Sequence, residues 1–552
     1  MSWDYFAGLL HYFVPLPVVI PLFAAGVKMA MGSRGPKFQQ WLSIIALTLV
    51  LAIGGVLMVG SYLFGPQAVQ IGGWEAPIGI TLVADQLSAL MVTVSAAVTL
   101  AVLVYSIGQG MASRAEVAPL SVYQPTYLIL VAGVSNAFLA GDLFNLYVGF
   151  EILLTASYVL LTLGGTQSRM RAGAIYVVVS LVSSVLFLIA IGLVFGATGT
   201  VNMAQLAERI PELQPDLRAV LQVFLLFAFG IKAAVFPLAA WLPDSYPTAP
   251  APVTAVFAGL LTKVGVYAII RAHTLLFPGQ LLSDLLMWVA LATMIMGILG
   301  AVAQTDIKRL LSFTLISHIG YMVFGVALGT ELGLAGAVFY VAHHITVQTT
   351  LFLITGLIER RGGSTSMDHL GGLVQIAPLL AVLFFVPAMN LGGIPPLSGF
   401  LGKLGLLQAG VEVGTPLAYT LVGASVLTSL LTLYVISRVW NYAFWRAPSE
   451  GRVADPGTVL EDTEADDTST AALGQGDAVG PSSRLGSSIT ASAPVVTSVA
   501  LPKSMLGATI ALVAFGLALT VFAGPLIDYS SDAATELLAR TPYIEAVLGG
   551  DR

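Results

Sequence analysis

Long apolar runs recur along the chain, and within each run apolar residues follow one another without alternating with polar ones. A bilayer core about 30 Å thick needs about 20 apolar residues in a helix. Continuous apolarity favours helices over a membrane barrel, whose strands alternate. We predict fourteen spans. They are residues 9–30, 38–64, 80–108, 125–142, 143–163, 171–196, 217–242, 248–270, 281–303, 308–329, 333–358, 374–409, 417–445 and 504–526.

The composition agrees with an all-α polytopic membrane protein in contact with a lipid bilayer. The 552 residues are 57% hydrophobic and only 9% charged, with a mean hydropathy of +0.90. The prolines of the first run favour a retained helix over a cleavable signal peptide. The chain has no cysteine, which excludes disulfides and thiolate metal sites. We find no phosphate-binding loop, hydrolase triad or haem motif, so we expect no cofactor, no metal, no nucleic acid and no ATP.

Basic residues predict the orientation of these spans, because loops rich in lysine and arginine stay in the cytoplasm. One set of alternate loops carries ten: Lys28, Arg34, Lys37, Arg114, Arg169, Arg171, Lys308, Arg309, Arg360 and Arg361. The opposite set carries three: Arg209, Arg218 and Arg271. An even number of spans then places both termini on the outer side. Residues 447–503 read as a disordered acidic cytoplasmic linker, with a regulatory or docking role as the alternative.

Two spans contain proline where an uninterrupted helix would not. Pro237 follows Phe236 in the seventh span, and the sequence Leu-Gly-Gly-Ile-Pro-Pro at 391–396 interrupts the twelfth. Within a membrane such breaks survive where the freed backbone groups meet protein or water. Lys232 lies before the first break and Lys403 after the second, which favours a transport role over ordinary kinks.

Four charged residues lie inside apolar runs: Glu151, Lys232, Lys263 and Lys403. A charge at the bilayer centre costs about 2.5–3.5 kcal/mol on insertion scales, and such residues usually face a bundle interior or a hydrated path. We predict that Glu151 and Lys232 are partners, and that Lys263, without a carboxylate in its span, is a proton relay. The alternatives are a static ion pair and lysines that extend to the membrane interface.

The eleventh span carries His343 and His344, and the tenth carries His318. Imidazole titrates near neutrality and passes protons between its two nitrogens, so a relay step between Lys263 and Lys403 is the leading interpretation. A packing role is the alternative, and it weighs most for His318. A metal site is less favoured because no carboxylate or cysteine accompanies the pair.

Three aspartates lie near span ends: Asp85, Asp142 and Asp244. The default interpretation of each is helix capping or loop stabilisation. Asp142 and Asp244 stay secondary candidates for the relay.

Three segments carry a resemblance to a known family. They are DLFNLYVGFE at 142–151, KAAVFPLAAWLPD at 232–244 and QTDIKRLLS at 304–312. Together they resemble the antiporter-like subunits of respiratory complex I and of Mrp-type sodium/proton antiporters, over roughly residues 75–445. The likeness is greatest to the D-type Mrp subunits. It implies fourteen helices with two inverted five-helix repeats and broken helices 7 and 12.

The resemblance also implies a division of the chain and a set of site residues. The divisions are 1–124 (helices 1–3), 125–270 (first repeat), 271–446 (second repeat), 447–503 (linker) and 504–552 (helix 14 and tail). The matching site residues are Glu151, Lys232, Lys263, His344 and Lys403. Since little chain follows the last span, we expect no long lateral helix.

One position departs from many relatives. They carry lysine four residues after the eleventh-helix histidine, where this chain has Gln348. A neutral amide forms hydrogen bonds but holds no proton charge, so the middle step would depend on His344, with His343 and water. Lys403 argues against the complex I subunit that has glutamate at this place.

The leading hypothesis is a proton-translocating subunit of a multi-subunit Na+/H+ antiporter in a bacterial cytoplasmic membrane, with other Mrp subunits as partners. The alternative is a proton-pumping subunit of a quinone-dependent NADH dehydrogenase or membrane-bound hydrogenase, in which case it would belong to a redox-driven translocase. A scaffold without transport and a standalone transporter are further alternatives. The sequence shows no sodium site, and sodium crossing at a contact with another subunit is an inference by elimination.

Overall fold

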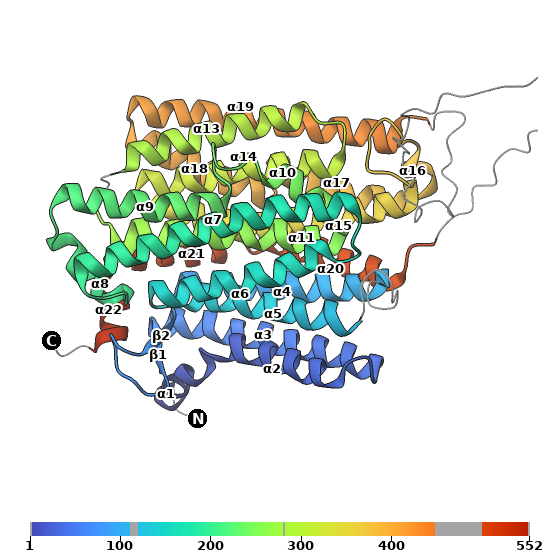
Figure 1. The fold of residues 1–552 in the computed structure, drawn as a ribbon. Coiled ribbons are helices and arrows are strands. Elements are labelled where there is room, and N and C mark those ends of the chain that lie inside the picture. The colour runs from blue at the N-terminus through green and yellow to red at the C-terminus, as the bar shows by residue number, and fades with distance from the viewer. Residues whose placement is uncertain (1–2, 111–119, 280–281, 448–499, 550–552) are drawn as a thin grey trace, which may run out of the picture.

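Long helices lie side by side and run the length of the molecule, and one small β-hairpin lies at an end of the bundle (Figure 1). The computed structural model describes residues 3–110, 120–279, 282–447 and 500–549. Almost all of the predicted linker 447–503 lies outside the described residues.

Twelve helical segments of the described chain are long and apolar enough to cross a membrane. They coincide with twelve of the fourteen predicted spans. The helices that form them are α1 (Trp3–Phe13) with α2 (Leu16–Met31), α3 (Pro36–Phe64), α4 (Gln86–Gln109), α5 (Leu120–Leu139), α6 (Leu143–Thr162), α7 (Gln167–Thr198), α11 (Ala251–Val256) with α12 (Thr262–Arg271), α13 (Ser283–Val302), α14 (Ile307–Leu328), α15 (Glu331–Gly362), α19 (Pro416–Val439) and α20 (Lys503–Val521).

The other two predicted spans are broken helices, as their prolines indicated. The first is α9 (Pro215–Ala233), which ends where Ala234 turns left-handed, followed by α10 (Leu242–Ser245). The second is α17 (Pro378–Gly392), which ends at the left-handed Gly393, followed by α18 (Ser398–Val413). A left-handed residue at this place closes a helix by turning its chain away.

The repeats and the count of fourteen stay predictions, but two details favour the repeats. Asp142 caps α6 and forms an isolated β-bridge with Asn202, which follows α7. Asp306 caps α14 and forms the same kind of bridge with Ser366, which follows α15. Each bridge precedes a broken helix, so the order of elements is the same in both halves.

The β-hairpin was not predicted. Strand β1 (Gln67–Ile71) pairs antiparallel with β2 (Ile80–Ala84), and Gln67 lies opposite Ala84. The predicted span 80–108 is therefore wrong at its start: its first five residues form the apolar strand, and Asp85 begins α4 with a capping box.

We call the end of the bundle with β1, β2, α8 (Met203–Arg209) and α22 (Thr541–Leu548) the hairpin end. The opposite end carries α16 (Leu373–Ile376) and is called the α16 end (Figure 1). Helices α1 and α22 both lie at the hairpin end, which agrees with an even number of crossings.

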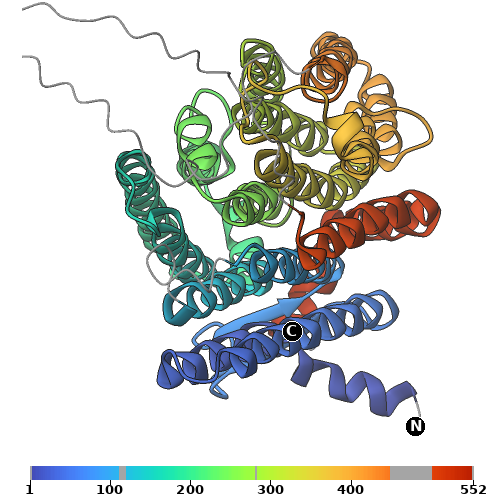
Figure 2. The same cartoon turned by 90° about the vertical axis from the view of Figure 1, so that its right-hand side faces the viewer.

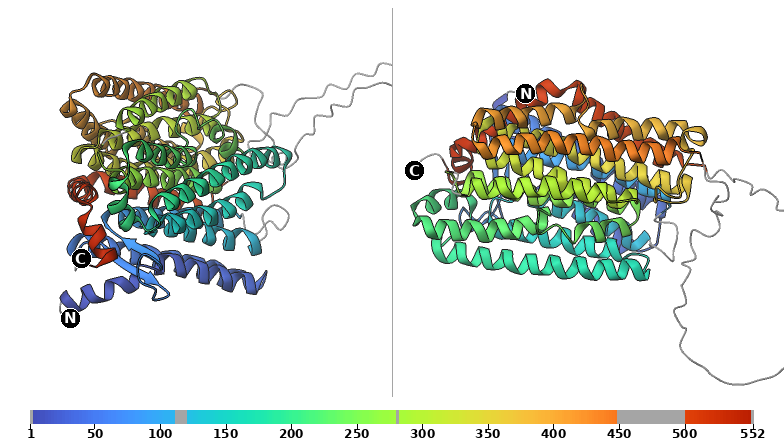
Figure 3. Two further views of the ribbon diagram at one scale, coloured as in Figure 1. Left: turned by 60° about the vertical axis from the view of Figure 1, so that its left-hand side comes forward. Right: turned by 90° about the horizontal axis from the view of Figure 1, so that it is seen from above.

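The core of the bundle positions the buried charges. The apolar stretches of α15 and of the span from α11 to α12 are entirely buried, and that of α14 is 94% buried. These helices lie between α3 on one side and α19 on the other (Figures 2 and 3). Side chains on α12, α14 and α15 are therefore shielded from lipid by other helices.

The predicted places of two basic residues, and the tail predicted after the last span, need correction. Lys28 and Arg271 are not loop residues: both are at least 97% buried, at the ends of α2 and α12. The excess of basic residues at the α16 end persists without them. The predicted tail is itself helical: after α20 the chain continues into α21 (Ala523–Ala539), which packs along α15 and α4, and then into α22.

Candidate functional site

The predicted partners Glu151 and Lys232 lie close together but are joined through a third residue. Ser184 of α7 donates a hydrogen bond to Glu151 Oε1. Lys232 Nζ, in the last turn of α9, donates to Ser184 Oγ at 3.2 Å. The ammonium also lies 4.8 Å from the ring centre of Phe150, a cation–π distance. A hydroxyl that both donates and accepts can transmit a change of charge between the two groups.

A small cavity begins at Lys232, where α9 breaks. Its volume is about 20 Å³, enough for about one water molecule. Its polar lining includes Ser180, Ser183 and Lys232, and the aromatic residues Tyr176, Trp241 and Tyr246 also line it. Leu261, two residues before Lys263, also contributes. The cavity therefore extends from the first lysine towards the helix that carries the second.

Lys263 lies at the start of α12, directly after a π-helical turn at Phe257–Leu261. The side chain is fully buried, and its Nζ donates to the carbonyl of Ala258 at 2.6 Å. A π turn reorients a helix carbonyl and is often found at functional sites. Here the turn provides the lysine with a neutral acceptor from its own helix.

Three buried histidines and one tyrosine form a cluster between α14, α15 and α18. The hydroxyl of Tyr340 lies 2.7 Å from His318 Nδ1. The ring centres of His318 and His344 are 5.1 Å apart, and those of Tyr340 and His343 are 5.3 Å apart, with the rings tilted in both pairs. His343 Nδ1 lies 3.0 Å from Ser398 Oγ, at the first residue of α18. The cluster connects the centre of the bundle to the second broken helix.

Several nitrogens of this cluster have no hydrogen-bond partner among the described residues. They are His318 Nε2, His343 Nε2 and both ring nitrogens of His344. Buried polar groups in proteins are almost always bonded to protein or water. Each of these nitrogens can accept or donate a proton, and each has room in its bonding pattern for a water molecule.

Lys403 lies in the second broken helix, as its position after Pro396 predicted. Its Nζ donates to the carbonyls of Leu391 and Gly392 at 3.1 and 3.5 Å. Those carbonyls belong to the last turn of α17, where the break leaves them without helical partners. The ammonium also lies 5.0 Å from the ring centre of Tyr321. The break thus supplies the oxygen acceptors that a buried lysine needs.

The secondary candidates Asp142, Asp244 and Gln348 are held by partners outside this set. Asp142 accepts from the backbone of Asn145 at 2.6 Å as a helix cap, and burial raises its pKa to about 6. Asp244 is exposed and pairs with Arg309 at 3.1 Å. Gln348 is fully buried, donates to Leu311 O at 2.8 Å and leaves its Oε1 without a partner among the described residues.

Sequence reasoning missed the hydroxyl and amide groups that link the charged residues. They are Ser184, Tyr340, Ser398 and Asn390, the last of which accepts from Gly399 N at 2.8 Å and donates to Ser398. Their only signal was polarity inside an apolar run. Within the described chain no cluster of three or more His, Asp or Glu side chains could hold a metal ion, and the expected absence of a metal stays a prediction.

Comparison with known proteins shows the family to which this chain belongs. Residues 140–432 match the family model described as NADH:quinone oxidoreductase/Mrp antiporter, TM. The D-type subunit of the Na+/H+ antiporter of Alkalihalophilus pseudofirmus is 41% identical over 440 residues, which are 79% of this chain and 87% of the relative. The corresponding D-type Na+/H+ antiporter subunit of Bacillus subtilis is 39% identical, over 80% of this chain and 88% of the relative.

Solved structures of related complexes agree with this family assignment. A chain of the Mrp complex from Dietzia sp. DQ12-45-1b superposes with a TM-score of 0.85 and 34% identity, covering 98% of this chain and 99% of that one. A chain of an archaeal membrane-bound sulfane sulfur reductase shares the fold alone, with a TM-score of 0.80, 24% identity and coverage of 98% and 99%. The chain therefore belongs to the NADH:quinone oxidoreductase/Mrp antiporter family, and within it to the D-type subunits of Mrp antiporters.

Proposed function

We propose that this subunit carries protons through a multi-subunit Na+/H+ antiporter, along a path that runs from Lys232 through Lys263 and His344 to Lys403. Glu151, through Ser184, controls the charge of Lys232. The relatives named as D-type Na+/H+ antiporter subunits, and the match to an Mrp complex, favour this function over a subunit of a redox-driven pump.

One observation carries the proposal. The relay residues are buried in the bundle core, and each lysine donates to a neutral oxygen instead of a carboxylate: Lys232 to Ser184, Lys263 to Ala258 and Lys403 to Leu391. A lysine without a paired carboxylate loses its proton more easily in a low-dielectric interior. Three such amines at successive breaks or π turns suit proton transfer better than static packing.

The entry side of the path lies at the α16 end. A surface groove there is lined by Gln167, Arg171, Asp244 and Thr248, among others. Neighbouring residues line the groove and the cavity at Lys232: Thr248 of the groove lies two residues after Tyr246 of the cavity. Protons would enter from the groove past Tyr246 and charge Lys232 and then Lys263.

The exit side lies towards the hairpin end, because α18 continues from the break in that direction. Protons would pass from His344 by way of His343 and Ser398 to Lys403. The excess of basic residues at the α16 end supports an orientation in which that end faces the cytoplasm of a bacterial cell and both termini lie outside. Sodium would cross elsewhere in the assembly.

Everted membrane vesicles test this function. The full set of Mrp subunits is expressed in a host that lacks its own antiporters, with and without this chain, and a pH-sensitive dye reports the lumen after a sodium pulse. We expect sodium to dissipate the pH gradient only when every subunit is present, and this chain alone to give no exchange. Exchange of wild-type rate without this subunit would refute the proposal.

A further inference from the structure

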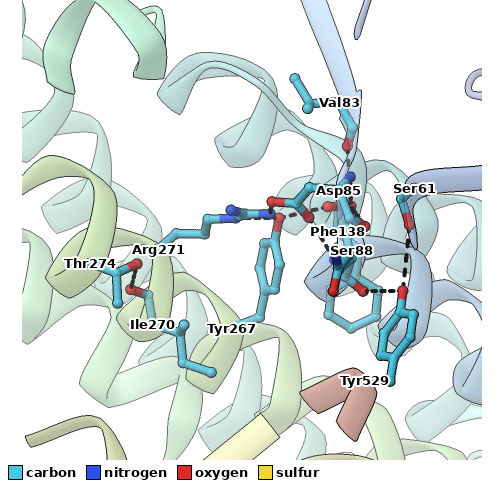
Figure 4. A network of polar contacts seen from close by, with 11 residues as sticks. Ser61, Val83, Asp85, Ser88, Phe138, Tyr267, Ile270, Arg271, Thr274 and Tyr529 are labelled. Atoms are coloured by element: carbon cyan, nitrogen blue, oxygen red, sulfur yellow. Dashed lines mark hydrogen bonds and ion pairs between the residues drawn. The ribbon is translucent and has the colours of Figure 1, made fainter. Parts of the chain in front are cut away.

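A buried ion pair lies at the hairpin end, outside the relay. Arg271, the last residue of α12, binds the carboxylate of Asp85, the N-cap of α4 (Figure 4). The two side chains are 4% and 1% exposed. Asp85 also accepts from the backbone N–H of Ser88 at 2.9 Å, so the positive end of α4 stabilises its charge.

Aromatic side chains enclose the guanidinium of Arg271. Its Nε donates to the hydroxyl of Tyr267 at 3.0 Å, and its central carbon lies 5.2 Å and 5.3 Å from the ring centres of Tyr267 and Tyr543. Arginine stays protonated in proteins. The site therefore holds one fixed positive charge, which Asp85 alone already balances.

A second carboxyl group faces the same pair. On α21, Tyr529 donates to the carbonyl of Gln86 at 2.9 Å, in the first turn of α4 (Figure 4). Glu536 follows Tyr529 by seven residues, about two helical turns, and so lies on the same side of α21. At this position its carboxyl group is near enough to Asp85 and Arg271 for their charges to act on it, and α21 packs against α4. If Asp85 and Glu536 were both ionised, two negative charges would face the single positive charge of Arg271.

The surroundings favour a neutral Glu536 that can lose its proton. Glu536 belongs to none of the membrane-spanning segments, and its burial, followed by the charge of Asp85, raises its pKa to about 8. The Oε1 of Gln86 and the hydroxyl of Tyr543 are at least nine-tenths buried and without a partner among the described residues. A protonated carboxyl or a water molecule would provide these oxygens with a hydrogen-bond partner.

Other ionisable groups near α21 do not compensate the extra carboxylate. Glu331 of α15 accepts from Thr535 at 2.9 Å, and Arg540 is bound to the carbonyls of Leu275 and Ala207. His273 lies on the π-helical segment that packs against α21, and Asp142 interacts with Tyr543. None of these groups is paired with Glu536.

The cluster is aligned with the relay. Lys263, Tyr267 and Arg271 follow at intervals of four on α12, so they lie along one face of that helix. We propose that Glu536, Asp85 and Arg271 form a second proton-binding site at the hairpin end, which exchanges one proton with the adjacent water phase and so changes the charge beside Arg271, two helical turns from Lys263 along α12. The proton leaves the Glu536 carboxyl for water, and no other bond changes. The effect on transport rests on the proposed function, but the titration does not.

Infrared difference spectroscopy on the purified complete complex tests the titration. Wild type, Glu536→Gln and the exposed control Asp532→Asn are compared as the pH is raised through 8. We expect a protonated carboxylic acid band that disappears near pH 8 in wild type and Asp532→Asn, and that is missing in Glu536→Gln. An identical titration in Glu536→Gln would overturn the proposal, as would loss of the band when sodium is added at constant pH, which would indicate a cation site.

The second readout is the pH profile of antiport in vesicles. Glu536→Gln fixes the neutral form. We expect the antiport rate of wild type and of Asp532→Asn to change as the pH on the hairpin side passes through 8, and the rate of Glu536→Gln to show no such change. A wild-type profile in Glu536→Gln would contradict the coupling to Lys263. If the complex performed no antiport, the infrared titration would still decide the site, so failure of the function and failure of the site are distinguishable.

Discussion

Glu151 and Lys232 are joined through the hydroxyl of Ser184, which donates to the carboxylate and accepts from the ammonium at 3.2 Å. A direct ion pair would hold both charges in place and oppose release of the lysine proton. A bridging hydroxyl instead lets the carboxylate influence the lysine while leaving the ammonium free to deprotonate. The geometry therefore suits a switch better than a structural pair.

Removal of this hydroxyl is the first test. Ser184→Ala leaves Glu151 and Lys232 without their common partner, and a hydrogen bond to a charged group contributes about 1.5–3 kcal/mol. We expect the antiport rate of the assembled complex to fall about tenfold to hundredfold. Ser184→Thr keeps a hydroxyl and should recover most of the rate, and Thr198→Ala on the same helix should have little effect. A wild-type rate in Ser184→Ala would show that the bridge is dispensable.

Two substitutions in the middle of the path compare the roles of His344 and Gln348. His344 has two unpartnered ring nitrogens among the described residues and can carry a proton, while Gln348 only hydrogen bonds. We expect His344→Leu to abolish antiport and Gln348→Leu to lower it only about twofold to tenfold, the effect of one neutral hydrogen bond. Sodium-dependent pH recovery in vesicles measures both. The reverse order of severity would place the proton step at Gln348.

The parts of the fold that the sequence predicted have strong local signals. Pro237 and Pro396, each near an intramembrane lysine, indicated both broken helices, because proline removes a backbone donor wherever it lies. The links between the charges have no such signal. Ser184 bonds across helices whereas Ser95 bonds to the carbonyl of Met91 in its own helix, and the sequence around them does not distinguish the two cases.

Residues near the ends of spans were the other source of error. Lys28 was interpreted as a loop residue, but its ammonium is buried and donates to the carbonyl of Gln39 at 2.9 Å and to the side chain of Gln124. The strand Ile80–Ala84 was merged with the following helix because both are apolar. In each case the deciding contact is made with another segment of the chain, which hydropathy along one segment does not reveal.

The most direct test of the relay is sodium-driven proton movement in everted vesicles that contain the assembled complex with Lys263→Ala. The exposed Lys37→Ala serves as the matched control, and subunit composition is verified after purification. The account predicts no recovery of the pH signal with Lys263→Ala and a normal recovery with Lys37→Ala. Antiport at the wild-type rate in a fully assembled Lys263→Ala complex would contradict it.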